Sequence, residues 1–155
     1  MKVNLRFIFT GKCKKKYIIE GTDKYLKILR KYGNIEIFEV KSKYSGSVSN
    51  AIEKEAADIL KLLRKNSVKI FLHLKGKEFS TESFSDYFGK LLFSGNSNFD
   101  FIIGGAYGFN ENLLKNADLT WKLSKLTFNH QMVRLILLEQ VYRILSILNG
   151  ESYHH

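Results

Sequence analysis

The stretch LSKLTFNHQMVRLILLEQVYRILSILNGESYH, residues 123–154, joins a polar loop, a strongly apolar helix and a polar tail without any spacer. At about 100° per residue, the helix places Arg134 on the same face as Leu137, Leu138 and Val141. Leucine and isoleucine also flank the polar residues of the opposite side, so the helix is apolar nearly all the way round. Such a helix is expected to be buried, and the loop and tail beside it are the expected place of the chemistry.

Two arrangements would bury this helix. A C-terminal helix normally keeps one solvated face in a domain of this size, so a second copy of the protein could cover it in a homodimer. A central core helix explains the same pattern without a partner. Arg134 needs a carboxylate, a cluster of backbone carbonyls or an anionic ligand, because an unpaired buried charge would cost several kcal/mol. Glu139 and Arg143 have the i,i+4 spacing of an ordinary helix pair.

Length and composition are those of one globular domain. The chain has 155 residues, of which 45% are hydrophobic, and a single domain spanning 1–155 is expected. No apolar run approaches the roughly 20 residues that cross a bilayer, and the start is too charged for a signal peptide, so a cytoplasmic protein without a membrane partner is expected. Cys13 is the single cysteine, and the four histidines contain no i,i+4 ligand pair, so no metal site is predicted.

The charge of the chain favours a polyanionic partner, first of all a nucleic acid. Its net charge is +10 and its pI is near 9.6, and a dense cluster is formed by Lys12, Lys14, Lys15 and Lys16. Each phosphate that a lysine neutralises releases counterions and adds salt-dependent affinity. The alternative is that the lysine run is only a solvated face, which is the more common meaning of such a run.

The hydrophobic pattern alternates between short strands and amphipathic helices. Strands are expected at residues 3–9, 35–40, 68–74, 99–103 and 119–123. Helices are expected at residues 14–31, 50–64 and 111–115, after a capping Ser80 or Thr81, and in the C-terminal stretch. A loop is expected at Lys75-Gly76-Lys77. This alternation predicts an α/β fold with a mostly parallel sheet and helices on both faces.

In open parallel sheets, ligands bind beyond the carboxyl ends of the strands. Three segments are expected to meet there: the one after Leu72, the glycine loop that begins at Gly104-Gly105, and residues 123–128. The glycine loop has the pattern G-G-x-x-G rather than the G-x-G-x-x-G of dinucleotide sites, so a dinucleotide is not expected. The plain alternative is a tight turn that needs positive φ.

Several motifs follow one another in the last third of the chain: FIIGGAYG at 101–108, LSKLTFNH at 123–130, Arg134, LEQVYR at 138–143 and the pair Tyr153-His154. Together with weaker likeness along the rest of the chain, they resemble the bacterial 23S ribosomal RNA pseudouridine N3-methyltransferases, which belong to the SPOUT class. Four positions depart from that pattern. His73 stands where the family usually has an aspartate, and Leu126 stands where methionine is common. Asn129 and Ser152 stand where the family often has proline, and Asn129 is expected to loosen the start of the last helix.

The resemblance implies a homodimer with a C-terminal trefoil knot and S-adenosylmethionine as the methyl donor. It implies that the substrate is a pseudouridine of 23S rRNA in the assembled ribosome. It also implies that the donor is contacted by Leu72, by the glycine loop at Gly104 and Gly105, and by the following loop, which consists of Leu123, Ser124, Lys125, Leu126, Thr127 and Phe128.

Methyl transfer from a sulfonium to a ring nitrogen needs alignment of donor and acceptor and removal of a proton, but no covalent nucleophile. The expected RNA-binding residues are His130 and Arg134, and Arg143 is expected to contact a phosphate or a developing anion. Base stacking is assigned to Tyr153, and proton acceptance to His154 or Glu139.

Two other functions are compatible with parts of the sequence. A non-catalytic ribosome-binding factor would keep the basic fold and lose donor binding, but the intact loops at 104–105 and 123–128 argue against it. An α/β enzyme that uses a different nucleotide is disfavoured by the missing dinucleotide fingerprint.

Overall fold

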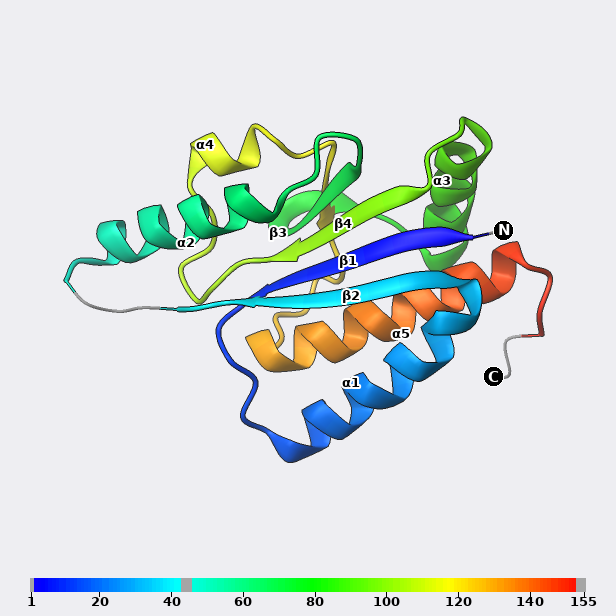
Figure 1. Cartoon of the computed structure of the whole chain (residues 1–155), viewed down its shortest axis with the longest axis horizontal. Coiled ribbons are helices and arrows are strands. Elements are labelled where there is room, and N and C mark those ends of the chain that lie inside the picture. Colours follow the sequence, from blue (N-terminus) through cyan, green and yellow to red (C-terminus); the bar gives the residue numbers. More distant parts are fainter. Residues whose placement is uncertain (1, 43–45, 153–155) are drawn as a thin grey trace.

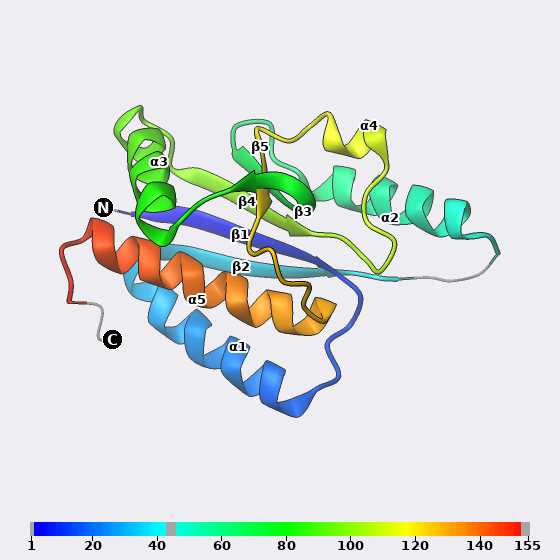
Figure 2. The same ribbon diagram turned by 180° about the vertical axis from the view of Figure 1, so that it is seen from behind.

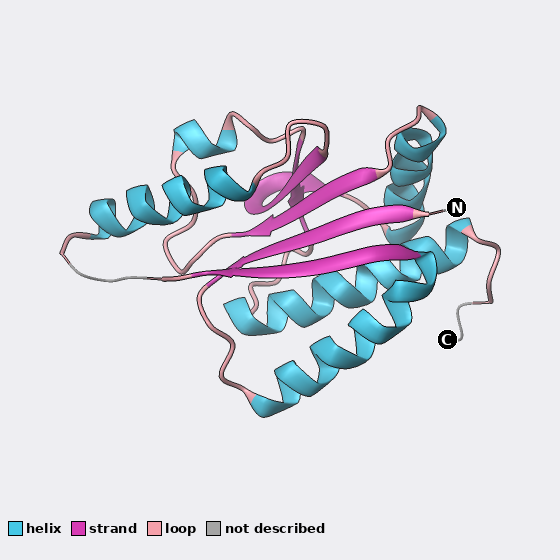
Figure 3. Cartoon of the chain, in the orientation of Figure 1, coloured by secondary structure: helices cyan, strands magenta, loops and turns pink. Residues whose placement is uncertain are grey.

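The computed structural model describes residues 2–42 and 46–152. The strands are β1 (Val3–Thr10), β2 (Gly33–Val40), β3 (Val68–Glu78), β4 (Asn98–Ile103) and β5 (Leu119–Lys122). The helices are α1 (Lys16–Leu29), α2 (Val48–Leu62), α3 (Thr81–Phe93), α4 (Glu111–Leu114) and α5 (His130–Leu148), with a 3-10 turn η1 (Arg30–Tyr32) after α1. Figure 3 shows this alternation along the chain.

The strands form one sheet of order β2-β1-β4-β3-β5, and every strand pair in it is parallel. Helices α1 and α5 cover one face and helices α2 and α4 cover the other, as Figures 1 and 2 show from opposite sides. Helix α3 packs with the α5 side, where Phe84 and Phe88 join the larger hydrophobic core. The smaller core lies between the sheet and α2 with α4. The predicted α/β class with helices on both faces is confirmed, whereas the trefoil knot stays a prediction.

Helix α5 is the core helix of the larger hydrophobic cluster. Leu137, Leu138, Val141 and Leu145 are each at most 2% exposed and pack on the sheet within the same chain. The apolar face that suggested a second copy is therefore covered inside the subunit. Helix α5 is one of the elements that a parallel sheet requires on its face, and its sequence pattern gives no support for a dimer.

The predicted loop at Lys75-Gly76-Lys77 is wrong, because these residues belong to β3. Strand β3 pairs with β5 from Ile70 to Leu72 and, after an irregularity, again at Lys77 and Glu78. Leu72 and Lys77 are both in register with Trp121. A side chain at Gly76 would place its Cβ 2.7 Å from the backbone of Thr120. Gly76 is therefore needed for close approach of β5, a role that sequence cannot separate from a turn.

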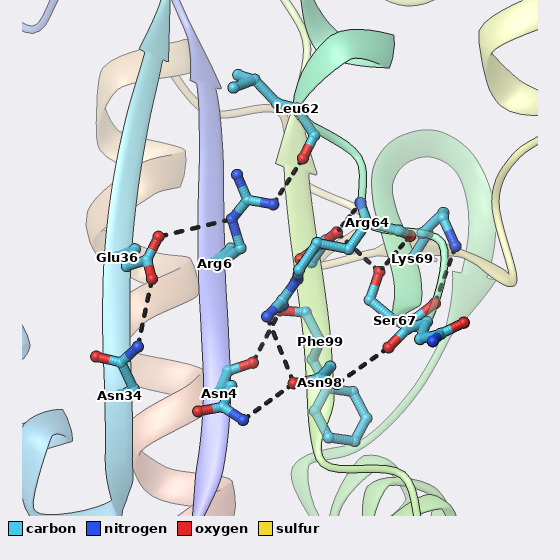
Figure 4. A network of polar contacts seen from close by, with 12 residues as sticks. Asn4, Arg6, Asn34, Glu36, Leu62, Arg64, Ser67, Lys69, Asn98 and Phe99 are labelled. Atoms are coloured by element: carbon cyan, nitrogen blue, oxygen red, sulfur yellow. Dashed lines mark hydrogen bonds and ion pairs between the residues drawn. The ribbon is translucent and has the colours of Figure 1, made fainter.

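A partly buried ion pair between Arg64 and Asp100 ties the amino ends of the central strands to the end of α2, and Figure 4 shows the polar network around Arg64. Asp100 in β4 is fully buried and accepts hydrogen bonds from Arg64 Nε at 2.9 Å and from Ser67 Oγ at 2.8 Å. The Arg64 guanidinium also donates to the carbonyls of Asn4 and Phe99. Because both charges are paired and hydrogen-bonded, their burial is tolerated. This network fixes the amino edge of the sheet, so the opposite edge is the one available for a ligand.

Candidate functional site

A cavity of about 500 Å³ opens at the carboxyl edge of the sheet. It lies between the middle of β3, the segments that follow β4 and β5, and the first turn of α5, where His130 and Val133 face it. Every residue predicted to contact a methyl donor lines this cavity except Lys125: Leu72, Gly104, Gly105, Leu123, Ser124, Leu126, Thr127 and Phe128. The structure therefore brings three segments far apart in sequence to one site.

Gly104 and Gly105 are favoured by tight packing rather than by positive φ. A Cβ on Gly104 would lie 3.0 Å from the ring of Phe109, and a Cβ on Gly105 would lie 2.9 Å from a carboxylate oxygen of Glu55. Positive φ in this loop occurs at Gly108, whose N–H donates to the carbonyl of Gly105 at 3.0 Å. The interpretation of the Gly-Gly pair as a positive-φ turn is therefore wrong, and the pair lets the loop pack tightly behind the cavity.

Glu55 was not singled out from the sequence, yet it supports the glycine loop from behind. It belongs to α2, is 5% exposed and accepts a hydrogen bond from Ser42 Oγ at 3.1 Å. Its carboxylate and the methyl group of Thr10 lie against the Cα of Gly105. Burial raises the pKa of the Glu55 carboxyl, and the Ser42 hydrogen bond only partly offsets this effect. A helical repeat of apolar residues gives no sign that one polar position points inward.

Glu55→Gln should change the pH dependence of stability. The raised pKa means that the folded chain keeps the Glu55 proton at pH values where the unfolded chain has released it. The contribution of Glu55 to the free energy of unfolding therefore falls as pH rises above about 4.3, the ordinary pKa of glutamate. The substituted amide does not titrate, so the melting temperature of the variant should rise relative to that of the wild type as the pH is raised from about 4 to about 7. A difference in melting temperature that is constant across this range would contradict the assignment.

The charged side chains that line the cavity in the described part of the chain are basic. Lys75 and Lys122 face it, together with His73 and His130, and Lys122 also pairs with Glu78 at 3.1 Å. His73 Nδ1 accepts a hydrogen bond from the backbone N–H of Lys75 at 3.1 Å. His73 thus shapes the turn after the first part of β3, and its ring forms part of the cavity wall.

The start of α5 is capped and firmly held, contrary to the expectation for Asn129. The Asn129 side chain accepts a hydrogen bond from the backbone N–H of Gln131 at 2.9 Å. Asparagine is a strong N-cap residue because its side chain satisfies a backbone donor that the helix leaves unpaired. Asn129 therefore fixes the helix turn that carries His130 into the cavity wall.

Arg134 points into the protein and not into the cavity. It is 2% exposed, and its guanidinium donates to the carbonyls of Thr10 at 2.9 Å and Gly11 at 2.6 Å. It also pairs with the carboxylate of Glu39 at 3.2 Å. Of the three kinds of partner considered, a carboxylate and backbone carbonyls are found. The RNA contact predicted for Arg134 does not fit this burial, and the residue instead holds the segment after β1.

Two of the remaining predicted catalytic residues, Glu139 and Arg143, do not line the cavity of their own chain. Glu139 and Arg143 lie further along α5 and form the i,i+4 pair, with Arg143 Nε 3.0 Å from Glu139 Oε1. Gln140 donates to the other Glu139 oxygen at 2.6 Å. Tyr153 and His154 lie outside the described residues.

The described residues contain neither a membrane-spanning helix nor a metal-binding cluster. Within 2–42 and 46–152, no helix is both long and apolar enough to cross a membrane. In the same ranges, no three His, Cys, Asp or Glu side chains gather as a metal site would require.

Comparison with known proteins assigns the chain to a family. Residues 1–154 match the family described as "Predicted SPOUT methyltransferase". The chain belongs to the SPOUT methyltransferases. It is 43% identical to the ribosomal RNA large subunit methyltransferase H of Alkaliphilus oremlandii and 40% identical to the putative ribosomal RNA large subunit methyltransferase H of Methanococcus maripaludis. Each comparison covers 98% of this chain and 99% of the relative.

A solved structure supports the fold. The tRNA (m1G37) methyltransferase from Aquifex aeolicus superposes with a TM-score of 0.56 at 17% identity, covering 98% of this chain and 75% of the other. SPOUT methyltransferases use S-adenosylmethionine, so this enzyme takes its methyl group from that donor.

The cavity fits a donor of this kind. Its volume falls within the roughly 300–1,000 Å³ typical of small-molecule sites. Backbone N–H and C=O groups of the 123–128 segment suit the edge of an adenine, and Lys75 or Lys122 suits the carboxylate end of the donor. In the described ranges, none of the side chains that line the cavity is acidic. This agrees with a ligand that carries a carboxylate.

Gly104→Val should weaken donor binding while the fold survives. The added side chain would begin 3.0 Å from the Phe109 ring, so the ring or the loop must shift, and both line the cavity. We expect the dissociation constant for S-adenosylmethionine to rise at least about tenfold, or about 1.4 kcal/mol. Titration calorimetry measures this constant, and a circular dichroism melt of the same variant checks the fold. Unchanged affinity in the folded variant would show that the loop's packing against Phe109 has no influence on the donor.

Proposed function

We propose that this protein transfers a methyl group from S-adenosylmethionine to N3 of a pseudouridine in 23S rRNA of the assembled ribosome. The observation that carries the proposal is the convergence of the predicted donor segments on one cavity. The names of the full-length relatives, ribosomal RNA large subunit methyltransferases H, support the class of RNA. A cytoplasmic location follows from this substrate.

The chemistry asks the protein to position groups rather than to form a covalent intermediate. The donor, when bound, supplies an electrophilic methyl group on its sulfonium. The residues of the chain must bring the base edge within about 3–3.5 Å of that group and accept the N3 proton. The carbon–nitrogen bond forms as the carbon–sulfur bond breaks, and the proton passes to a basic side chain. Exclusion of water by the half-buried rings of Phe109 and Phe128 would keep the reacting groups in a low dielectric.

The end of α5 lies far from the cavity of its own subunit. Helix α5 begins in the cavity wall and runs for 19 residues, or about 28 Å, to the amino edge of the sheet. Figures 1 and 2 both show its end beside the N-terminus. There, Glu151 bonds to Lys31 Nζ at 2.5 Å and to Tyr32 Oη at 2.9 Å. From Glu151, the three residues that lead to His154 extend at most about 10 Å.

We therefore propose a homodimer in which Tyr153 and His154 act at the partner's cavity. Glu139 and Arg143, which lie partway along α5 and away from the cavity of their own subunit, would approach the same shared site from the partner. His130 remains the candidate for contact with RNA at the cavity mouth, because it is exposed and lines the cavity. Arg134 keeps its internal role.

The dimer should use the part of α5 that the core leaves accessible. Ile136 is partly exposed in a shallow groove with Phe79, Phe128 and Gln140, whereas Leu138 and Val141 lie in the core and would report on folding instead. Ile136→Glu should yield monomers, because a carboxylate would be desolvated at the contact. Light scattering measures the mass. The matched control is Leu60→Glu, at a 43% exposed position on the opposite face of the sheet. A dimer that survives Ile136→Glu would place the contact elsewhere.

One assay tests the proposed function. Ribosomes purified from a strain that lacks the modification are incubated with the enzyme and tritiated S-adenosylmethionine, and the labelled nucleotide is mapped. Label on N3 of a pseudouridine in 23S rRNA is expected. No heat and no thermal shift on titration with S-adenosylmethionine would instead favour the non-catalytic ribosome-binding factor. Donor binding without label in 23S rRNA would show that a different RNA is the substrate.

A further inference from the structure

The segment between β1 and α1 carries a dense group of exposed positive charges. We name residues 12–16 the lysine loop, since Lys12, Lys14, Lys15 and Lys16 all lie in it and all are exposed. Lys16 is 3.8 Å from Glu20 in a solvent-exposed pair. Within residues 2–42 and 46–152, no acidic side chain lies within ion-pair distance of the other three ammonium groups. The charge of the loop is therefore largely uncompensated.

The lysine loop is held in place through its backbone. Gln131 Oε1 accepts hydrogen bonds from the backbone N–H groups of Lys14 at 3.2 Å and Lys15 at 3.3 Å. Glu39 accepts from the N–H of Cys13 at 3.0 Å. Arg134 donates to the backbone carbonyls just before the loop. The side chains of Gln131, Glu39 and Arg134 therefore fix the loop, whereas its lysine side chains are exposed and do not contribute to the core.

These anchors place the lysines next to the cavity. Gln131 belongs to the same turn of α5 as His130 and Val133, which line the cavity. Thr10, the last residue of β1, lies against the Cα of Gly105 in the glycine loop. The lysine loop thus starts beside the glycine loop, which forms one wall of the cavity, and is hydrogen-bonded to the first turn of α5, which forms another.

We propose that the lysine loop docks the phosphate backbone of the RNA that carries the target base. This inference rests on the proposed function, and it identifies the surface of the protein that contacts the RNA. A fixed loop loses little conformational freedom when it binds, so each lysine contact contributes more to affinity than it would on a mobile segment. A solvated lysine face would need neither the three anchoring side chains nor a place beside the cavity. Arg134, Gln131 and Glu39 act as positioning residues.

The test compares two triple variants with equal loss of charge. In the first, Lys12, Lys14 and Lys15 become Gln. In the control, Lys61, Lys65 and Lys90 become Gln; these are exposed and lie near the ends of α2 and α3 that lead to the amino edge of the sheet. Binding to purified ribosomes is measured by filter retention across a range of salt concentrations, and donor affinity is measured by calorimetry.

The loop variant should bind ribosomes at least about tenfold more weakly than the wild type at about 0.15 M salt, and its plot of log affinity against log salt should be shallower by about 2 to 3. Donor affinity and the methyl transfer rate at saturating ribosomes should be preserved. The control variant should stay within about threefold of the wild type. Equal behaviour of the two triple variants would overturn the inference, even where the wild type methylates ribosomes. Absence of methylation by the wild type would instead refute the proposed function, and the binding comparison would still decide the role of the loop.

A second variant tests the anchoring. Gln131→Leu removes the acceptor for Lys14 and Lys15 while every lysine remains. Ribosome binding should weaken about threefold to tenfold, while the slope of log affinity against log salt stays unchanged. The number of phosphate contacts is the same, and only the entropic cost of ordering the loop on binding is larger. A fall in the slope, or full affinity, would contradict the positioning role of Gln131.

Discussion

A chain that ends at Ser152 should bind S-adenosylmethionine normally and transfer methyl groups at least about a hundredfold more slowly than the wild type, the scale on which loss of a positioned acid or base acts. The described candidate for the proton acceptor, Glu139, is engaged by Arg143 and Gln140 and does not line the cavity of its own chain. His154 is therefore the preferred acceptor, and Tyr153 is the preferred stacking partner of the base.

Two point variants separate the contributions of Tyr153 and His154 to the effect of this deletion. Tyr153→Ala should mainly weaken ribosome binding, whereas His154→Ala should mainly lower the single-turnover rate and alter its pH profile. Removal of His155 alone is the matched control and should leave the rate unchanged. Full activity of the chain that ends at Ser152 would exclude the tail from the mechanism and leave Glu139 as the proton acceptor.

The order of strands and helices could be predicted from periodicity, because buried parallel strands and amphipathic helices differ in period. What failed was the assignment of single residues whose role depends on a neighbour far away in sequence. Gly76 and Gly105 look like turn residues, yet each is small because another segment, at Thr120 or Glu55, lies against it. Local sequence does not contain that neighbour.

The candidate site shows the same division. The donor segments were predicted from the position of loops after strands and from the family resemblance, and the structure brings all but Lys125 to one cavity. Arg134 was correctly expected to be buried with a partner, but the choice between carbonyls and an RNA phosphate depended on where the segment after β1 runs. The amphipathic pattern of α5 likewise could not distinguish a core helix from a dimer contact, since both bury the same leucines.

Mixing two impaired variants should raise the activity above that of either variant alone if the tail works in the partner's cavity. The Gly104→Val subunit has an impaired cavity and an intact tail, and the subunit that ends at Ser152 has the reverse. In a mixed dimer, one cavity is intact and receives an intact tail from the other subunit. With random pairing, half of the dimers are mixed and each has one working site, so the mixture should reach about a quarter of the wild-type rate.

This experiment separates the two possible paths of the tail. If the tail served its own cavity, neither subunit of the mixed dimer would hold a complete site, and the mixture would remain as slow as its components. The length of α5 and the contacts of Glu151 with Lys31 and Tyr32 argue for the partner's cavity. The rate is measured with donor near its wild-type dissociation constant, where the Gly104→Val cavity is largely empty. The subunits are exchanged by mild denaturation and refolding of the mixture, and each variant treated alone in the same way provides the baseline.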